Sequence, residues 1–159
     1  MKRKMLLLPL ILVVMLSSVV VSAYAAGWES FEYQIELGDQ ENLVLRYVGN
    51  KVLQTFTQEG TVKENGDVIG TISIEVFYQL ENPVVLPLKG HAVAKFTMNL
   101  EGIGLVEGVM EARIIVDFVP EQTQTMTGRF NGHGDINIRG TLNDLDGNPN
   151  VIVLEGYAK

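Results

Sequence analysis

From residue 27 onward, apolar and polar residues alternate along most of the chain. Every second residue from Phe31 to Leu37 is apolar, and the residues between them are Glu or Gln. The same alternation recurs at 72–80, 94–100 and 110–118. A period of two is typical of a strand with one buried face, and no stretch shows the 3.6-residue period of an amphipathic helix. The pattern therefore predicts an all-β domain.

Turn signals divide this alternation into strands. Asn65-Gly66 is typical of a type I′ hairpin, and Gly49 can adopt the positive φ that a type II′ hairpin requires. Glycine turns are also expected at 102–104, 131–134 and 146–147. Together these signals predict nine strands, near residues 28–37, 43–48, 51–62, 67–80, 88–101, 105–118, 123–132, 134–142 and 150–158.

The length of these strands favours a closed sheet. Long antiparallel strands joined by short turns twist, and closure removes the exposed edges of the sheet. We therefore expect an antiparallel up-and-down β-barrel of about eight or nine strands, with a two-sheet β-sandwich as the alternative. Gly70, Gly108 and Gly128 lie inside strands and suit the bends that a small barrel needs.

Residues 1–26 are different in kind. Lys2, Arg3 and Lys4 precede an apolar run, and Ala23-x-Ala25 provides the small residues that a signal peptidase requires. This pattern predicts an N-terminal signal helix, with residues 27–159 as a single exported domain. An uncleaved anchor is the alternative, because Met5–Ala26 is long enough to cross a bilayer as a helix. In both cases we expect the domain to be secreted or on the exterior of the cell envelope, either extracellular or periplasmic. Once the leader is removed, no transmembrane segment is expected.

The net charge and the lack of cysteine exclude several classes of function. The chain has 159 residues and a net charge of −7, but residues 27–159 carry 19 acidic and nine basic side chains, a net charge of −10. A nucleic-acid-binding protein needs a basic surface, so this class is excluded. The chain has no cysteine, which excludes disulfides, thiol nucleophiles and cysteine-ligated zinc.

One glycine-rich segment resembles a known family. Thr127–Gly134, followed by Gly140-Thr141-Leu142, is similar to a hairpin of the allene oxide cyclase-like barrels. That group includes the dirigent proteins and small bacterial barrels of unknown role. The resemblance covers about 16 residues of the chain and implies a barrel fold. No site residue or activity is carried over from it.

Aromatic and methionine side chains are the candidates for contact with a small, partly apolar ligand. Aromatic residues gather at the start of the domain, and methionines occur on apolar strand faces, where they suit either an adaptable pocket or ordinary core packing. The candidates are Trp28, Phe31, Tyr33, Met98, Met110 and Phe130, and Met126 also belongs to an apolar face.

The segment Asp144–Glu155 is the candidate calcium site. Its side-chain oxygens stand at positions one, three, five, seven and twelve, which is the ligand spacing of an EF-hand: Asp144, Asp146, Asn148, Asn150 and Glu155. Pro149 replaces the usual glycine at the sixth position, and the segment after it has the pattern of a strand. We therefore expect a solvated acidic loop, with calcium binding as the alternative, and no other cofactor.

Catalytic groups are sparse in the exported domain. Ser30 and Ser73 are its only serines, and His91 and His133 are its only histidines. Neither pair stands in a catalytic motif. The main hypothesis is therefore an exported, non-enzymatic barrel that binds a small, partly apolar ligand or simply acts as a stable surface module. The alternatives are a structural subunit of an extracellular filament or surface layer that self-associates by strand addition, and a cyclase-like barrel enzyme.

Overall fold

The computed structural model describes residues 27–81, 86–117 and 123–159. The predicted leader, residues 1–26, lies outside the described residues. The chain divides into two compact units, and Ser30–Ala158 forms the one that contains the sheet.

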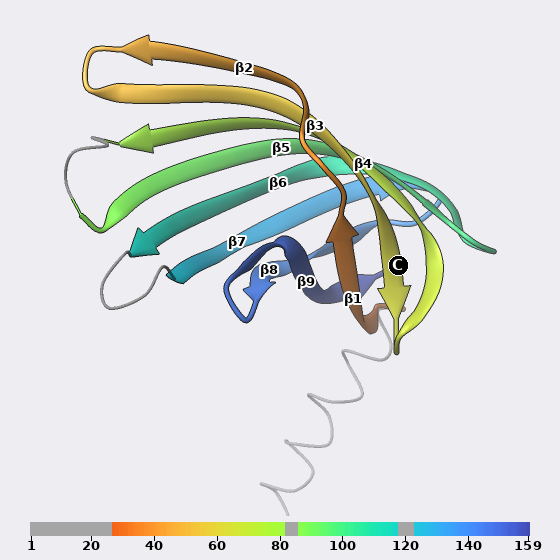
Figure 1. Ribbon diagram of the computed structural model, residues 1–159. Coiled ribbons are helices and arrows are strands. Elements are labelled where there is room, and N and C mark those ends of the chain that lie inside the picture. The colour runs from red at the N-terminus through yellow and green to blue at the C-terminus, as the bar shows by residue number, and fades with distance from the viewer. Residues whose placement is uncertain (1–26, 82–85, 118–122) are drawn as a thin grey trace, which may run out of the picture. The chain divides into compact units, whose positions relative to one another are not determined.

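Nine antiparallel strands form one sheet, and no helix occurs among the described residues (Figure 1). The all-β prediction is therefore confirmed. The sheet order is β1-β9-β8-β7-β6-β5-β4-β3-β2, a meander in which each of β2 to β9 pairs with its sequence neighbours. The strands are β1 (Glu29–Leu37), β2 (Glu41–Val48), β3 (Lys51–Glu64), β4 (Asp67–Glu81), β5 (Leu88–Leu100), β6 (Gly104–Asp117), β7 (Thr123–Gly134), β8 (Ile138–Leu145) and β9 (Asn148–Ala158).

The first strand closes the sheet into a barrel. β1 neighbours β9 and also pairs with β3, with Ile35 opposite Val62. Eight strands, β1 and β3–β9, therefore form a closed antiparallel barrel, and β2 is an additional strand outside the closed ring. The two-sheet sandwich, the alternative expected from the sequence, is not the fold that forms.

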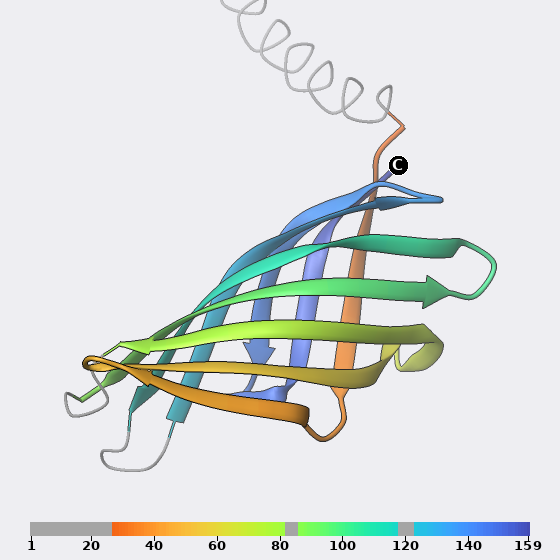
Figure 2. The ribbon, with the colours of Figure 1, turned by 90° about the horizontal axis from the view of Figure 1, so that it is seen from above.

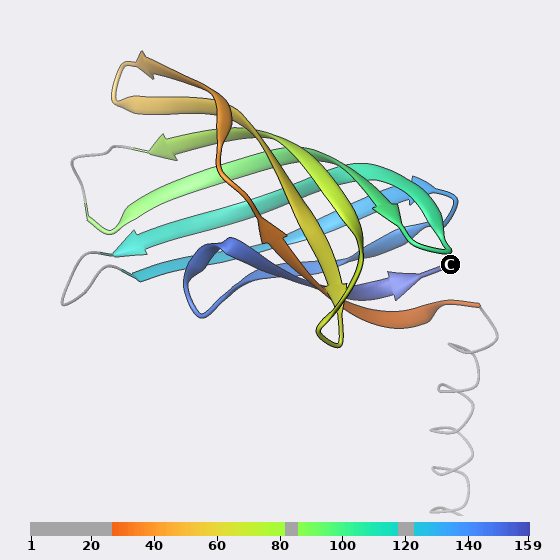
Figure 3. The same ribbon diagram turned by 45° about the vertical axis from the view of Figure 1, so that its right-hand side comes forward.

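β1 and β2 lie one after the other along the same edge of β3. β1 pairs with residues 60–63 of β3, and β2 pairs with residues 51–57. The connector, residues 38–40, stands opposite only two residues of β3, so the chain bends there as at a β-bulge. Two hydrogen bonds hold the connector: Gly38 N donates to Glu59 O at 2.8 Å, and Gln58 Nε2 donates to Gly38 O at 2.8 Å. Beyond this bend β2 leaves the closed ring, as Figures 2 and 3 show.

Most predicted turns occur where expected, and one does not. Asn65 and Gly66 both have positive φ, as does Gly49 at the β2–β3 turn. The turn expected at 131–134 was placed too early, because β7 continues to Gly134 and pairs with β6 throughout, with Gly132 opposite Gly108. The chain reverses at 135–137 instead, where Leu105 N donates to Asp135 Oδ2 at 2.7 Å and Asp135 N donates to Leu105 O at 2.9 Å.

One half of the barrel interior is densely packed. It lies toward the Asn65-Gly66 turn, and we call it the packed half. The ring of Phe96 lies over two glycines there, since a Cβ at Gly108 or Gly132 would come within 2.8 Å of its Cζ. Large side chains that face glycines pack closely in this half. The side chains with less than 2 % exposure that belong to this half are Ile35, Val62, Met98, Leu100, Val106, Ile138 and Leu154.

Candidate functional site

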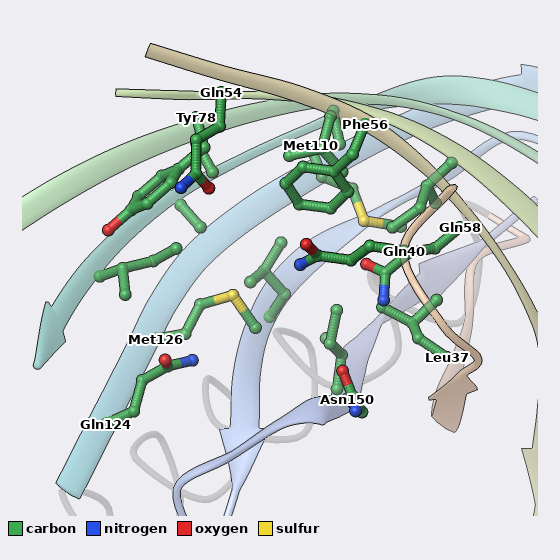
Figure 4. A pocket seen from close by; sticks show the side chains of 18 of the residues that line it. Leu37, Gln40, Gln54, Phe56, Gln58, Tyr78, Met110, Gln124, Met126 and Asn150 are labelled. Carbon is green, nitrogen blue, oxygen red and sulfur yellow. The ribbon is translucent and has the colours of Figure 1, made fainter. Parts of the chain in front are cut away.

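The other half of the barrel contains a cavity of about 350 Å³ (Figure 4). It extends from the middle of the barrel toward the end that carries the Gly49-Asn50 and Asp146-Gly147 turns. We call this half of the barrel interior the hollow half. β3, β4, β5, β6 and β7 all contribute residues to its wall, and residues of β1, β8, β9 and the β1–β2 connector complete it.

Small side chains create the cavity. In β5 the inward positions are Ala92 and Ala94 in the hollow half but Phe96, Met98 and Leu100 in the packed half. Ala112 of β6 lies directly opposite Ala92. Side chains of this size do not reach the barrel axis, so the interior stays open where they meet.

The cavity lining is mainly apolar, as is usual for small-molecule sites. Met110 and Met126 contribute flexible thioether side chains that adapt to the shape of a ligand. The apolar lining residues are Leu37, Phe56, Ile74, Val76, Ala92, Ala94, Met110, Ala112, Ile114, Val116, Met126, Leu142 and Ile152.

The polar lining groups are all uncharged. They are five amides and one phenol, and no charged side chain occurs among the described residues of the lining: Gln40, Gln54, Gln58, Tyr78, Gln124 and Asn150 (Figure 4). The ring of Tyr78 packs over Gly90, where an added Cβ would lie 2.6 Å from Tyr78 Cζ. Burial raises the pKa of the Tyr78 phenol further above its usual value of 10.0, because burial disfavours the charged phenolate.

Gln58 differs from the other amides because it is buried. It is 5 % exposed and is the only buried polar side chain among the described residues. Gln54 is partly exposed, and Gln40 and Asn150 are exposed. The hydrogen bond from Gln58 Nε2 to Gly38 O ties this side chain to the bend between β1 and β2. The site therefore combines one fixed amide with several that are free to rotate.

β2 carries apolar side chains on the same face of the sheet as the cavity lining. Leu45 lies opposite Gln54, and Tyr47 lies opposite Val52, so both face the same side of the sheet as the cavity lining. All eight residues of β2 are exposed, including Leu43, Leu45 and Tyr47 at 48 %, 47 % and 77 %. An edge strand with this much exposed apolar surface is unusual, because edge strands normally carry charges or are covered.

The structure distributes the sequence-predicted ligand residues over both halves. Met110 lines the cavity. Tyr33, Met98 and Phe130 are buried in the packed half, and Phe31 stacks on Tyr33 with ring centroids 4.3 Å apart. Phe31 also contacts the ring of Phe130, at 5.9 Å. Trp28 precedes β1 and does not line the cavity.

The predicted calcium ligands are spread along a hairpin. Asp144 lies opposite Ile152, whereas Glu155 lies opposite Thr141, three pairs further along the ladder. Asp144 Oδ1 accepts a hydrogen bond from Met126 N at 2.6 Å, and its buried Oδ2 has no partner. Asn148 Oδ1 accepts from Asn150 N at 3.0 Å, and Asp146 occupies the turn with positive φ. Within residues 27–81, 86–117 and 123–159, no group of three acidic or histidine side chains is arranged to hold a metal ion.

The two histidines lie apart on the outer surface. His91 of β5 faces Arg113, and His133 of β7 faces Glu107, six positions away along β6. Both are exposed. The arrangement therefore brings neither histidine to the cavity nor to the other.

The sequence analysis missed the amides that face the cavity. Gln54 and Gln58 alternate with Val52 and Phe56, so they occupy the apolar phase of β3. A polar residue in the inward phase of a strand is a signal for a lined cavity, because a polar group in a filled core would have to be paired. The small inward residues Ala92 and Ala94 give a second signal.

Comparisons with protein-family models, with curated proteins and with solved structures found no match to this chain. Among the residues that the structure describes, no helix has the length and hydrophobicity to cross a membrane.

Proposed function

We propose that this protein is exported and that its barrel binds a small, uncharged, predominantly apolar molecule. The observation that carries the proposal is the hollow half, in which small side chains leave about 350 Å³ inside an otherwise packed barrel. A cavity that is apolar and holds a few converging polar groups is the usual form of a small-molecule site. An empty apolar cavity also costs stability, so its presence calls for an explanation.

The neutral lining supports an uncharged ligand. A charged ligand group would lose its hydration in the cavity, where the described lining residues provide no counter-charge. The signal-like pattern of residues 1–26 and the net charge of −10 beyond them support an exported, soluble domain.

A binding titration with matched variants tests this proposal. The purified domain is titrated with Nile red, an uncharged fluorescent probe of apolar sites. Ala112→Phe places a ring in the cavity, and we expect it to weaken probe binding at least tenfold. Val109→Phe adds the same ring to an exposed position of the same strand, and we expect it to bind the probe as the wild type does.

A second filling variant covers the case in which Ala112→Phe does not fold. Ala94→Leu fills less of the cavity and should also weaken binding of the probe. Thermal unfolding verifies that each variant is folded. Equal probe affinity in the wild type and both folded cavity variants would contradict the proposal.

The free edge of β2 favours a second candidate function, self-association of the chain. β2 carries one acid, Glu41, and one base, Arg46, so two copies can approach here without the repulsion expected between strongly acidic surfaces. An antiparallel pair centred on Val44 places Leu43 opposite Leu45 and sets no like charges opposite each other. Such a contact by itself gives a closed dimer, and a filament or surface layer would need a further contact.

Light scattering at increasing protein concentration tests the self-association. The double variant Val44→Lys/Val48→Lys adds charge to the edge strand, and we expect it to remain monomeric under conditions in which the wild type dimerises. Val109→Lys, on the outer face of the closed wall, is the control and should dimerise normally. A wild-type protein that stays monomeric at high concentration excludes this second function and leaves the ligand proposal unaffected.

A further inference from the structure

We propose that Gln58 recognises a hydrogen-bond donor on the ligand, so that the cavity selects apolar molecules that carry a hydroxyl or an uncharged N–H group. The inference rests on the proposed function of the cavity and specifies the chemical class of its ligand.

The hydrogen bond to Gly38 O determines which way the Gln58 amide points. Its partner, the carbonyl oxygen of Gly38, can only accept a hydrogen bond, so the Gln58 side chain must direct its NH₂ group toward it. The other end of the amide, Oε1, is an acceptor with two lone pairs. A rotation by half a turn would set two oxygens against each other and leave Gly38 O without its donor. The side chain therefore presents an acceptor on its remaining side.

That acceptor remains available to a ligand. No described residue donates a hydrogen bond to Gln58 Oε1. The one buried side-chain oxygen or nitrogen without a partner, among the described residues, is Asp144 Oδ2, so Gln58 Oε1 still has accessible surface. Because the Gln58 side chain is 5 % exposed and lines the cavity, that surface faces the cavity.

The other polar groups of the lining do not provide this selectivity. Gln40 and Asn150 are exposed, and Gln54 and Gln124 are partly exposed, so rotation of each amide offers either a donor or an acceptor. The hydroxyl of Tyr78 can likewise either donate or accept a hydrogen bond. A ligand without a donor would bury Gln58 Oε1 against apolar atoms and lose the hydration of that oxygen. A carboxylate would set its own lone pairs against it. The fixed amide therefore favours uncharged donors over ethers and over acids.

A pair of isomeric ligands isolates the contribution of the donor. Competition against Nile red is measured for 1-octanol and for 1-methoxyheptane, which have the same composition but differ in the O–H group. We expect the wild type to bind the alcohol about tenfold more tightly, which corresponds to one hydrogen bond to a buried acceptor. Gln58→Met keeps the length of the side chain and removes the amide, so the ratio of the two affinities should fall to about one.

Gln79→Met is the matched control. It removes an amide from β4 that is partly exposed and lies outside the cavity lining, and we expect it to keep the wild-type preference for the alcohol. A wild-type ratio near one overturns the inference, even if Gln58→Met does not fold. So does a ratio that Gln58→Met leaves unchanged. In these outcomes the proposed binding function survives if Ala112→Phe still blocks the probe. Failure of the probe and of both isomers to bind the wild type would overturn the function as well.

Discussion

Tyr33 and Tyr78 show how burial sets the state of single side chains in this barrel. Tyr33 lies in the packed half, where burial raises the pKa of its phenol and the charge of Glu64 raises it further. Tyr78 lines the cavity, and burial raises the pKa of its phenol too. A buried phenolate would be poorly solvated, so both side chains are held in the neutral form that can donate a hydrogen bond.

These two raised pKa values predict a loss of stability at alkaline pH. In the unfolded chain a phenol ionises near its ordinary pKa of 10.0, before it does so in the folded barrel. The unfolded state then binds fewer protons than the folded state, so the free energy of unfolding falls as pH rises. The contribution of the two protonated phenols to the free energy of unfolding is fully present below about pH 10 and is lost progressively above it. Urea denaturation at a series of pH values measures this decline.

The variants Tyr33→Phe and Tyr78→Phe identify the source of that decline. Each removes one ionising phenol and keeps the ring, so each should make the loss of stability above about pH 10 less steep. A decline of unchanged steepness in both variants would show that other groups cause it.

At the scale of elements, the bend between β1 and β2 determines where the barrel is closed. Before the bend in the chain, β1 pairs on both sides, with β3 and β9. After the bend, β2 pairs only with β3 and is exposed along its whole length. Gln58 and Gly38 connect the two parts, since the buried amide of β3 donates to the carbonyl of the connector. The hydrogen bond from Gln58 to Gly38 therefore connects the bend between β1 and β2 to a residue that lines the cavity.

The difference between β2 and the inner strands predicts uneven amide exchange. Local opening of an edge strand breaks few buried contacts, so the backbone amides of β2 should exchange with deuterium orders of magnitude faster than those in the middle of β5. Mass spectrometry of peptides from 41–48 and 92–100 measures the two rates. Equal protection in a monomeric sample would mean that β2 is more firmly held than its exposure indicates, and protection that increases with concentration would support pairing of two copies.

At the scale of the whole molecule, the two halves of the barrel interior are packed differently. Most of the side chains that are almost completely buried belong to the packed half, whereas the hollow half gives up part of that packing to hold a cavity. Proteins commonly show this division, because a binding site needs space that a maximally stable core would fill.

This division predicts opposite effects of one substitution on stability and binding. Ala94→Leu adds apolar volume to space that already exists, so it should raise the free energy of unfolding by about 0.5–2 kcal/mol. The same substitution should lower the affinity of the barrel for Nile red. In the packed half, Leu154→Ala should lower the free energy of unfolding by about 2–5 kcal/mol, because the neighbouring side chains cannot close the gap. Thermal and urea unfolding measure both changes. A loss of stability in Ala94→Leu would indicate that the cavity walls do not accept the larger side chain.

Local patterns predicted the strands well because their causes are local. The period-two alternation of 72–80 and the Asn65-Gly66 turn depend on strand geometry and on positive φ, which neighbouring residues largely determine. The turn at 131–134 was misplaced because Asn131, Gly132 and Gly134 are residue types that favour turns. Their pairing with β6 is a tertiary contact, which overrides that preference.

The site was much harder to predict than the strands. Of the predicted ligand residues, Met110 lines the cavity, while Tyr33 and Phe130 belong to the packed half. An inward position on a strand specifies a face of the sheet, but its height along the barrel depends on the register of all the strands. Gln58 acquires its fixed orientation only from Gly38, which lies 20 residues earlier in the chain.

The amino-acid sequence was enough to establish the strand class, most turns, the acidic and cysteine-free character of the domain, and the alternation that separates inside from outside. The folded barrel was needed to see that β1 closes the ring, that β2 leaves it, and that the alanines of β5 and β6 meet at one height. The reason is physical: periodicity and turn chemistry act between neighbours in the chain. Closure, register and empty volume arise from side chains that are distant in sequence and meet only when the sheet has curled.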